Sequence, residues 1–105
     1  LLFLIEMKKE YKLKEKVWLY PGRASWYFLT VPTSIAKDID FFFSMYKRGW
    51  GSLPVKVTVG ETHWRTSIFP DKKTESYLLP LKAEIRKKEQ INKNDLISFV
   101  MEISS

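Results

Sequence analysis

The chain has 105 residues, of which 45% are hydrophobic and 29% are charged, and this balance indicates a folded domain rather than a disordered segment. It contains no cysteine, which excludes disulfide bridges, thiolate nucleophiles and cysteine-ligated zinc. The formal net charge of +6 favours anionic partners such as nucleic acid or a small anion, although many proteins of this size are equally basic and bind neither.

The chain begins with five apolar residues that Glu6 interrupts. This stretch is too short for the core of a signal peptide, and a membrane span needs roughly 20 apolar residues. Met7 followed by Lys8 is typical of a bacterial start, so we expect residues 1–6 to be a non-native or disordered extension. The lack of cysteine and of a membrane span predicts a cytoplasmic protein without a membrane partner.

Residues 9–19 alternate between apolar and lysine-rich positions, which predicts a half-buried strand. Glu15 falls on the apolar side of this pattern and predicts a bulge or a bend there. Pro21-Gly22 supplies a turn, and residues 25–31 are apolar on both faces, as expected for a central strand.

A helix is predicted to begin after Pro32, with Thr33 or Ser34 as its N-cap. Apolar residues then recur at helical spacing, at Ile35, Ile39, Phe42, Phe43 and Tyr46. Gly49 is expected to end this helix.

Residues 54–69 predict a hairpin with a defined register. Valines alternate with polar residues up to Val59, and Gly60-Glu61 makes a two-residue turn with glycine first. This turn pairs Val57 with Trp64 on the core face and sets Lys56 opposite Arg65 on the outer face.

The remaining residues predict a short strand at 77–79 that Pro80 ends, a basic helix at 81–90, a turn at 92–95 and a last strand at 96–103. Core residues of the last strand should be Ile97, Phe99, Met101 and Ile103. The order strand, proline, helix, strand occurs twice, which suggests two related halves. We therefore predict a mainly β (α+β) fold, in which residues 7–105 form a single six-stranded β-barrel domain with two short α-helices.

Four motifs resemble a bacterial family of domains of unknown function, number 1905. They are Gly49-Trp50-Gly51-Ser52, Val55-x-Val57-x-Val59-Gly60, Trp64-x-Thr66-Ser67-x-Phe69-Pro70 and Tyr77-x-Leu79-Pro80-x-Lys82-x-x-Ile85-Arg86-Lys87. The resemblance runs from about Tyr11 to Ile103 and implies a barrel of the double-split type with no established activity. Asn94 departs from it, because family members often carry glycine before that aspartate. The last third of the chain also resembles, at the level of fold, the swapped-hairpin regulators of the AbrB and MazE type.

Catalysis has little support in the sequence. His63 is the only histidine, so one chain cannot form a site with two histidine ligands. Asp38 and Asp40 are two residues apart on a predicted helix and should point in different directions. We expect a protein that is not an enzyme and that uses no metal or cofactor.

Two groups of basic residues are candidate binding sites. Lys56, His63 and Arg65 would hold an anion between the opposed cations, unless they form an ordinary solvated strand face. Lys82 and Arg86 on the second helix would contact phosphates, unless that helix face is simply exposed.

Two tryptophans are candidates for an exposed aromatic surface. Trp18 is expected to point outward beside the lysines of the first strand. Trp50, between two glycines, could stack on a planar ligand or instead close one end of the barrel as a buried ring.

The sequence thus favours a small non-enzymatic binding or interaction module and does not specify its biological role. The alternatives are a nucleic-acid-binding, regulator-like domain that uses the basic helix and strand face, and a barrel that binds a small anion. Sequence alone leaves homodimer formation open.

Overall fold

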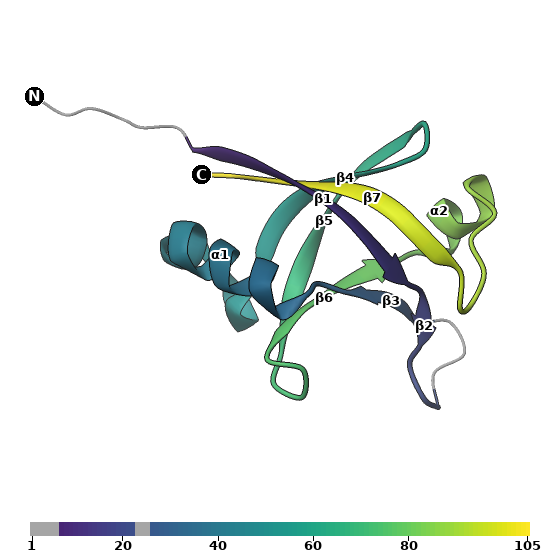
Figure 1. The fold of residues 1–105 in the computed structure, drawn as a ribbon, viewed down its shortest axis with the longest axis horizontal. Coiled ribbons are helices and arrows are strands. Elements are labelled where there is room, and N and C mark those ends of the chain that lie inside the picture. Colours follow the sequence, from purple (N-terminus) through teal and green to yellow (C-terminus); the bar gives the residue numbers. More distant parts are fainter. Residues whose placement is uncertain (1–6, 23–25) are drawn as a thin grey trace, which may run out of the picture.

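The computed structural model describes residues 7–22 and 26–105, so the expectation for residues 1–6 lies outside the described residues. The chain folds into strands with two α-helices and two short 3₁₀ turns (Figure 1). In chain order these are β1 (Lys8–Lys16), β2 (Trp18–Leu19), β3 (Tyr27–Thr30), α1 (Thr33–Phe43), η1 (Ser44–Tyr46), η2 (Gly49–Gly51), β4 (Leu53–Val59), β5 (Thr62–Asp71), β6 (Ser76–Leu81), α2 (Ala83–Lys88) and β7 (Leu96–Ser104).

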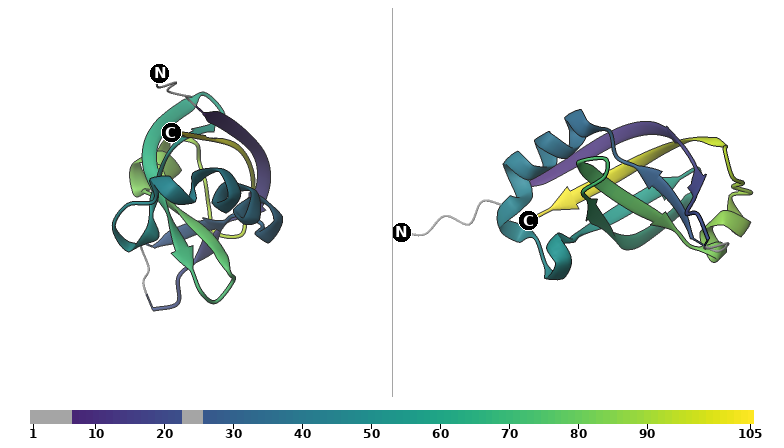
Figure 2. Two further views of the ribbon diagram at one scale, coloured as in Figure 1. Left: turned by 90° about the vertical axis from the view of Figure 1, so that its left-hand side faces the viewer. Right: turned by 90° about the horizontal axis from the view of Figure 1, so that it is seen from below.

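The strands form one antiparallel sheet of seven strands in the order β1-β7-β4-β5-β6-β3-β2. The first and last strands of this order are consecutive in the chain, with only Val17 between them. The chain therefore joins the two ends of the sheet, and the sheet curls into a small barrel (Figure 2). With β1 and β2 counted as one bent strand, the mainly β barrel with two helices agrees with the fold predicted from the sequence.

The bend between β1 and β2 is built around Val17. Its side chain is fully buried, its N–H donates to the carbonyl of Asp95, and its carbonyl accepts from the N–H of Asn94. The backbone groups at the bend thus keep hydrogen-bond partners. Neither the bulge nor the bend expected at Glu15 occurs at that residue, because Glu15 stays in the regular β1–β7 ladder opposite Ile97 and the chain bends two residues later, at Val17.

The two halves of the chain, from β1 to β4 and from β5 to β7, have equivalent strand pairings. β3 pairs with β6 and β4 pairs with β7, so each strand beside a helix pairs with its counterpart from the other half. β1 pairs with β7 just as β5 pairs with β4. This agrees with the repeated order of strand, proline, helix and strand in the sequence.

The barrel interior holds the core, and the two helices lie at opposite ends of the barrel (Figures 1 and 2). The hairpin register is confirmed, since Val57 lies opposite Trp64 and Lys56 opposite Arg65. Core residues of β7 are also confirmed, with Ile97 half-buried and the rest buried. The largest fully buried side chains are Tyr77, Phe43, Leu29, Ile39, Leu53, Ile68, Leu79, Leu81, Met101 and Ile103.

Helix α1 differs from the prediction at both ends. Pro32 is its N-cap residue, and its carbonyl accepts the N–H groups of Ile35 and Ala36 without a side-chain cap. The helix ends at Phe43, where the chain tightens into a 3₁₀ turn, and does not reach Gly49.

Two aspartates fix α1 to the barrel from different sides. Asp38 accepts hydrogen bonds from Lys9 Nζ and Tyr11 Oη of β1, both at 2.7 Å. Asp40 accepts a hydrogen bond from Tyr77 Oη of β6. As predicted, the two carboxylates point apart, and each ties the helix to a different strand.

Strand β6 continues through Pro80, which had been expected to end it. Pairing with β5 stops at Leu78, so Pro80 has a partner strand on one side only, opposite Phe28. A residue without an N–H is tolerated at such a position. Helix α2 is correspondingly shorter than predicted, because Lys82 precedes it as the N-cap residue.

Candidate basic cleft beside strands β4 and β5

A cleft of about 730 Å³ opens beside the outer face of β4 and β5. Lys56 and Arg65 line it as directly opposed, exposed residues of the hairpin. Arg48, from the segment between η1 and η2, and Lys8, from β1, line it as well. We call this site the basic cleft and define it by Lys8, Arg48, Lys56 and Arg65.

Positively charged side chains outnumber negatively charged ones in the basic cleft. Glu102 of β7 is the only acidic side chain among its described lining residues, and it forms an ion pair with Lys8 at 3.0 Å. The hydrogen bond and the charge of Glu102 raise the pKa of Lys8. In the part of the chain that the structure describes, no carboxylate lies within ion-pair distance of Arg48, Lys56 or Arg65. Three cations are therefore available to an anionic ligand.

His63 does not line the basic cleft, although it belongs to the same predicted patch. Its Nδ1 lies 3.1 Å from Oγ1 of Thr58, its partner across the hairpin. The side chain thus has a local hydrogen-bond partner nearer the hairpin turn.

A strained turn follows Arg48. Trp50 has a φ of 63°, a left-handed conformation that is unfavourable for a bulky residue. Hydrogen bonds close the turn, from Gly51 N–H to the Arg48 carbonyl at 2.9 Å and from Arg48 N–H to the Ser52 carbonyl at 2.8 Å. The indole side chain is 93% exposed, so Trp50 does not close the barrel as a buried ring. Strain of this kind in a solvent-exposed aromatic residue is a signal of function.

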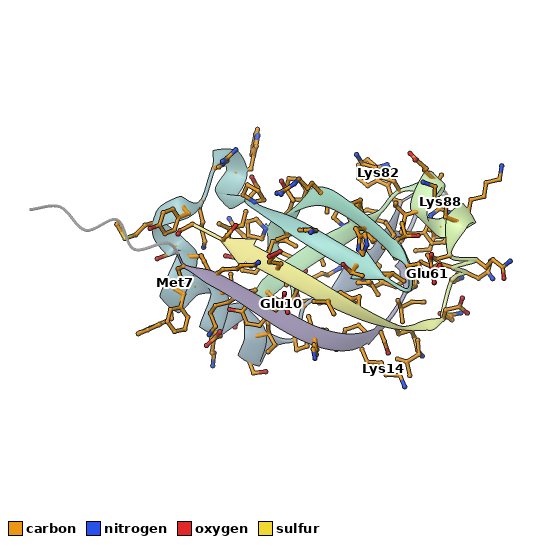
Figure 3. All side chains as sticks on the ribbon, turned by 90° about the horizontal axis from the view of Figure 1, so that it is seen from above. Met7, Glu10, Lys14, Glu61, Lys82 and Lys88 are labelled. Carbon is orange, nitrogen blue, oxygen red and sulfur yellow. The ribbon has the colours of Figure 1, made fainter. Side chains whose placement is uncertain are left out.

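The basic residues of the second predicted patch lie elsewhere. Neither Lys82 nor Arg86 lines the basic cleft, and Figure 3 shows Lys82 near the α2 end of the barrel. The guanidinium of Arg86 stacks on the ring of Tyr27 at 3.8 Å, and its Nε–H donates to the carbonyl of Leu81 at 3.1 Å. Arg86 is thus engaged in holding α2 against the barrel, which leaves Lys82 as the exposed cation of the pair.

Trp18 is half-buried rather than exposed. Its indole N–H donates to Oγ1 of Thr30 at 2.9 Å, and its ring packs against Phe28 with 5.2 Å between centroids. The lysine-rich pattern of β1 does not extend past the bend at Val17, so the alternation that placed Trp18 outward fails there.

The sequence reasoning missed Arg48 and Lys8 as site residues. Arg48 had been placed in the last turn of a longer helix, whereas the chain turns back along β4 after Phe43. Lys8 reaches the cleft only because β1 pairs with β7 over its whole length. The one available signal was the Gly-Trp-Gly sequence, in which a large aromatic residue stands where the backbone turns sharply.

Two other features of the described residues bear on function. No group of three or more His, Cys, Asp or Glu side chains within residues 7–22 and 26–105 could hold a metal ion. Neither helix in the described part of the chain is long and apolar enough to cross a membrane.

The fold and its cleft define a small antiparallel β-barrel protein with two helices. The chain belongs to the family described as domain of unknown function (DUF1905), whose sequence profile matches residues 14–101. The function of the domain is therefore unknown, as the sequence predicted. No curated protein matches the chain, and the comparisons give no support to the analogy with AbrB and MazE regulators.

Proposed function

We propose that this protein is a non-catalytic module that binds single-stranded nucleic acid in the basic cleft, with Trp50 stacking on a base. One observation carries the proposal. Trp50 is 93% exposed and is held in a left-handed backbone conformation two residues after Arg48. Arg48 lines the cleft together with Lys56 and Arg65, and none of these three cations has an ion pair with a carboxylate of the described residues. Single-strand binding combines a basic groove with an exposed aromatic ring. Trp50 is not a lining residue of the cleft, so its ring would extend the site from the turn that follows Arg48.

The cations of the cleft supply the phosphate contacts. Arg48, Lys56 and Arg65 have no ion pair with a described carboxylate, so binding a phosphate does not break an existing bridge. Three phosphate contacts on a single strand correspond to a slope of about −2 in log K against log salt. Glu102 opposes these contacts, but its pairing with Lys8 reduces that repulsion.

The exposed indole favours a single strand over a duplex. Stacking on an unpaired base contributes about 1–3 kcal/mol per base, whereas the bases of a duplex are already stacked on each other. The regulator-like alternative requires the basic helix, and α2 has only 6 residues, with Arg86 engaged against Tyr27. We therefore infer that the cleft rather than the helix binds nucleic acid.

A small anion is the second candidate ligand for the same cleft. The observation that favours it is the direct opposition of Lys56 and Arg65, which an anion between the two side chains would relieve. This candidate makes no use of Trp50, so the two proposals differ in the residue on which they depend.

Fluorescence anisotropy of labelled oligouridine tests the proposal, at low and at near-physiological salt, with a DNA duplex of equal length beside it. We expect the wild type to prefer oligouridine, Trp50→Gly to weaken its binding about tenfold, and Arg65→Gln to reduce the salt slope by about 0.7. Lys93→Gln removes the same charge from an exposed turn outside the cleft and should change neither.

The outcomes separate the candidates. No binding of oligouridine at low salt, or binding that is unaffected by Trp50→Gly, contradicts the proposal. A thermal shift with inorganic pyrophosphate that is lost in Arg65→Gln and kept in Trp50→Gly would assign the cleft to a small anion instead.

A further inference from the structure

A second cavity on the barrel surface is separate from the basic cleft, since the two share no lining residue. It has a volume of about 500 Å³ and lies over β3, β5 and β6. We call it the aromatic groove. Its principal lining residues are Tyr20, Trp26, Phe28, Phe69, Pro80 and Lys82.

The aromatic rings of the groove pack against one another but remain partly exposed to solvent. Tyr20 and Trp26 pack edge to face with 5.7 Å between centroids, and the Tyr20 N–H donates to the Trp26 carbonyl at 2.8 Å. Tyr20, Trp26 and Phe69 are 42%, 47% and 42% exposed. Large rings held in place at this exposure form a surface suited to a ligand.

We propose that the aromatic groove binds a proline-rich peptide segment that carries acidic flanking residues. This proposal is independent of nucleic-acid binding in the basic cleft. It follows from the chemistry of the groove lining and from its charge.

The lining is almost wholly apolar, with Lys82 as its charged residue. A ligand rich in hydrogen-bond donors, such as a base or a sugar, would leave polar groups buried without partners. Proline has no backbone N–H, and a polyproline II segment keeps its carbonyls in water while its rings pack on aromatic side chains. Such a segment is also rigid before it binds, which lowers the entropic cost of association.

The charged side chain of the groove lining is basic. Lys82 lines the groove directly, and Arg86 and Lys87 follow it in the sequence on α2. Lys82 and Lys87 form no ion pair with a carboxylate of the described residues. Acidic residues that flank the proline-rich segment would therefore meet a complementary charge.

A second copy of the chain fits this groove less well. The chain carries a net charge of +6, so a copy would bring its own positive charge toward Lys82. Its 5 prolines are at positions 21, 32, 54, 70 and 80, too far apart to form a proline-rich segment. The occupant we infer is thus a partner protein.

Selection from a displayed library of random peptides tests the inference, with the wild type and Phe69→Ala as parallel baits. We expect peptides enriched in proline and in Asp or Glu from the wild type, and loss of that enrichment from Phe69→Ala. Phe41→Ala is the matched control, because Phe41 is an exposed ring on α1 that does not line the groove. Thermal melts by circular dichroism verify that each variant is folded.

The strongest selected peptide, labelled, is then titrated by anisotropy. We expect about tenfold weaker binding to Lys82→Glu, and no change with Phe41→Ala. Enrichment without proline, no enrichment, or enrichment that survives in Phe69→Ala would overturn the proposal. Oligouridine binding that is lost in Phe69→Ala would instead assign the groove to nucleic acid, and a dimer that dissociates in Phe69→Ala would assign it to self-association.

Discussion

Lys56 and Arg65 lie directly opposite each other on β4 and β5, and both line the basic cleft. On its other side Lys56 lies opposite Glu102 of β7, so one of its two cross-strand neighbours is acidic. Arg65 has only Lys56 as a cross-strand neighbour, because β5 pairs with β6 only from Phe69 onward. Among the residues paired across β7, β4 and β5, Arg65 therefore faces only the like charge of Lys56, which is electrostatically unfavourable. Such a position is expected for a residue that is retained for binding rather than for stability.

Arg65→Thr should leave the protein as stable as the wild type or stabilise it by about 0.2–1 kcal/mol. The substitution removes the like-charge pair with Lys56 and introduces a residue with high strand propensity. Urea unfolding measures the effect, and the gain should shrink at high salt as the repulsion is screened. A loss of more than about 1 kcal/mol would show that Arg65 is a structural residue.

Trp50→Gly should raise the free energy of unfolding by about 1 kcal/mol while weakening oligouridine binding. Glycine adopts the left-handed conformation of this turn without strain, and the exposed indole contributes little burial to the folded state. Denaturant titration of wild type and variant tests the stability half of this prediction. Destabilisation would mean that the indole packs on the protein and is not kept for a ligand.

Gly60→Ala should destabilise the protein by about 2–3 kcal/mol. Gly60 has a φ of 56°, which strains any residue with a Cβ. That Cβ would also displace the flexible carboxylate of Glu89, which would lose the hydrogen bond that it accepts from Thr62 Oγ1 at 2.5 Å. Gly22→Ala provides the control, because Gly22 has a φ of 78° and no atom of the described residues lies within 4 Å of a Cβ there.

The difference between these two glycine variants isolates the cost of displacing the Glu89 carboxylate from Thr62. Adding Glu89→Ala to Gly60→Ala should recover part of the loss. Equal losses in Gly22→Ala and Gly60→Ala would indicate that backbone strain alone accounts for the effect.

Asp38→Asn should flatten the decline in stability below about pH 4. Hydrogen bonds from Lys9 and Tyr11 lower the pKa of Asp38 below its usual value of 3.8. A carboxyl whose pKa is lowered in the folded state stabilises it above the unfolded pKa, and this stabilisation is lost as the pH falls through the folded pKa. Thermal melts between pH 2 and pH 7 measure the slope. Glu61→Gln, an exposed carboxyl without an ion pair among the described residues, should keep the wild-type profile.

The β4–β5 hairpin was predictable in detail because two independent signals agreed. Valine alternation fixed which side chains face the core, and Gly60-Glu61 fixed the loop length, so only one register satisfied both. The opposition of Lys56 and Arg65 followed from that register. Local periodicity and turn chemistry are sufficient for a contact between residues close in the sequence.

The rest of the basic cleft was not predictable in this way. Arg48 and Lys8 are 40 positions apart in the sequence and both line one cleft with the hairpin. The helical spacing of apolar residues continues to Tyr46, so it did not show that α1 ends at Phe43. The prediction that Trp18 points outward was wrong for a related reason, because the bend at Val17 moves the chain from the strand at one end of the sheet to the strand at the other end.

Proton–nitrogen NMR of the indole N–H groups during titration with oligouridine tests the central claim most directly. The chain has 4 tryptophans, and each gives one indole resonance that a single Trp→Phe variant assigns. We predict that the Trp50 resonance shifts most, while Trp18, whose indole N–H is bonded to Thr30, does not move. An unchanged Trp50 resonance in the presence of saturating oligouridine would contradict the proposed binding site.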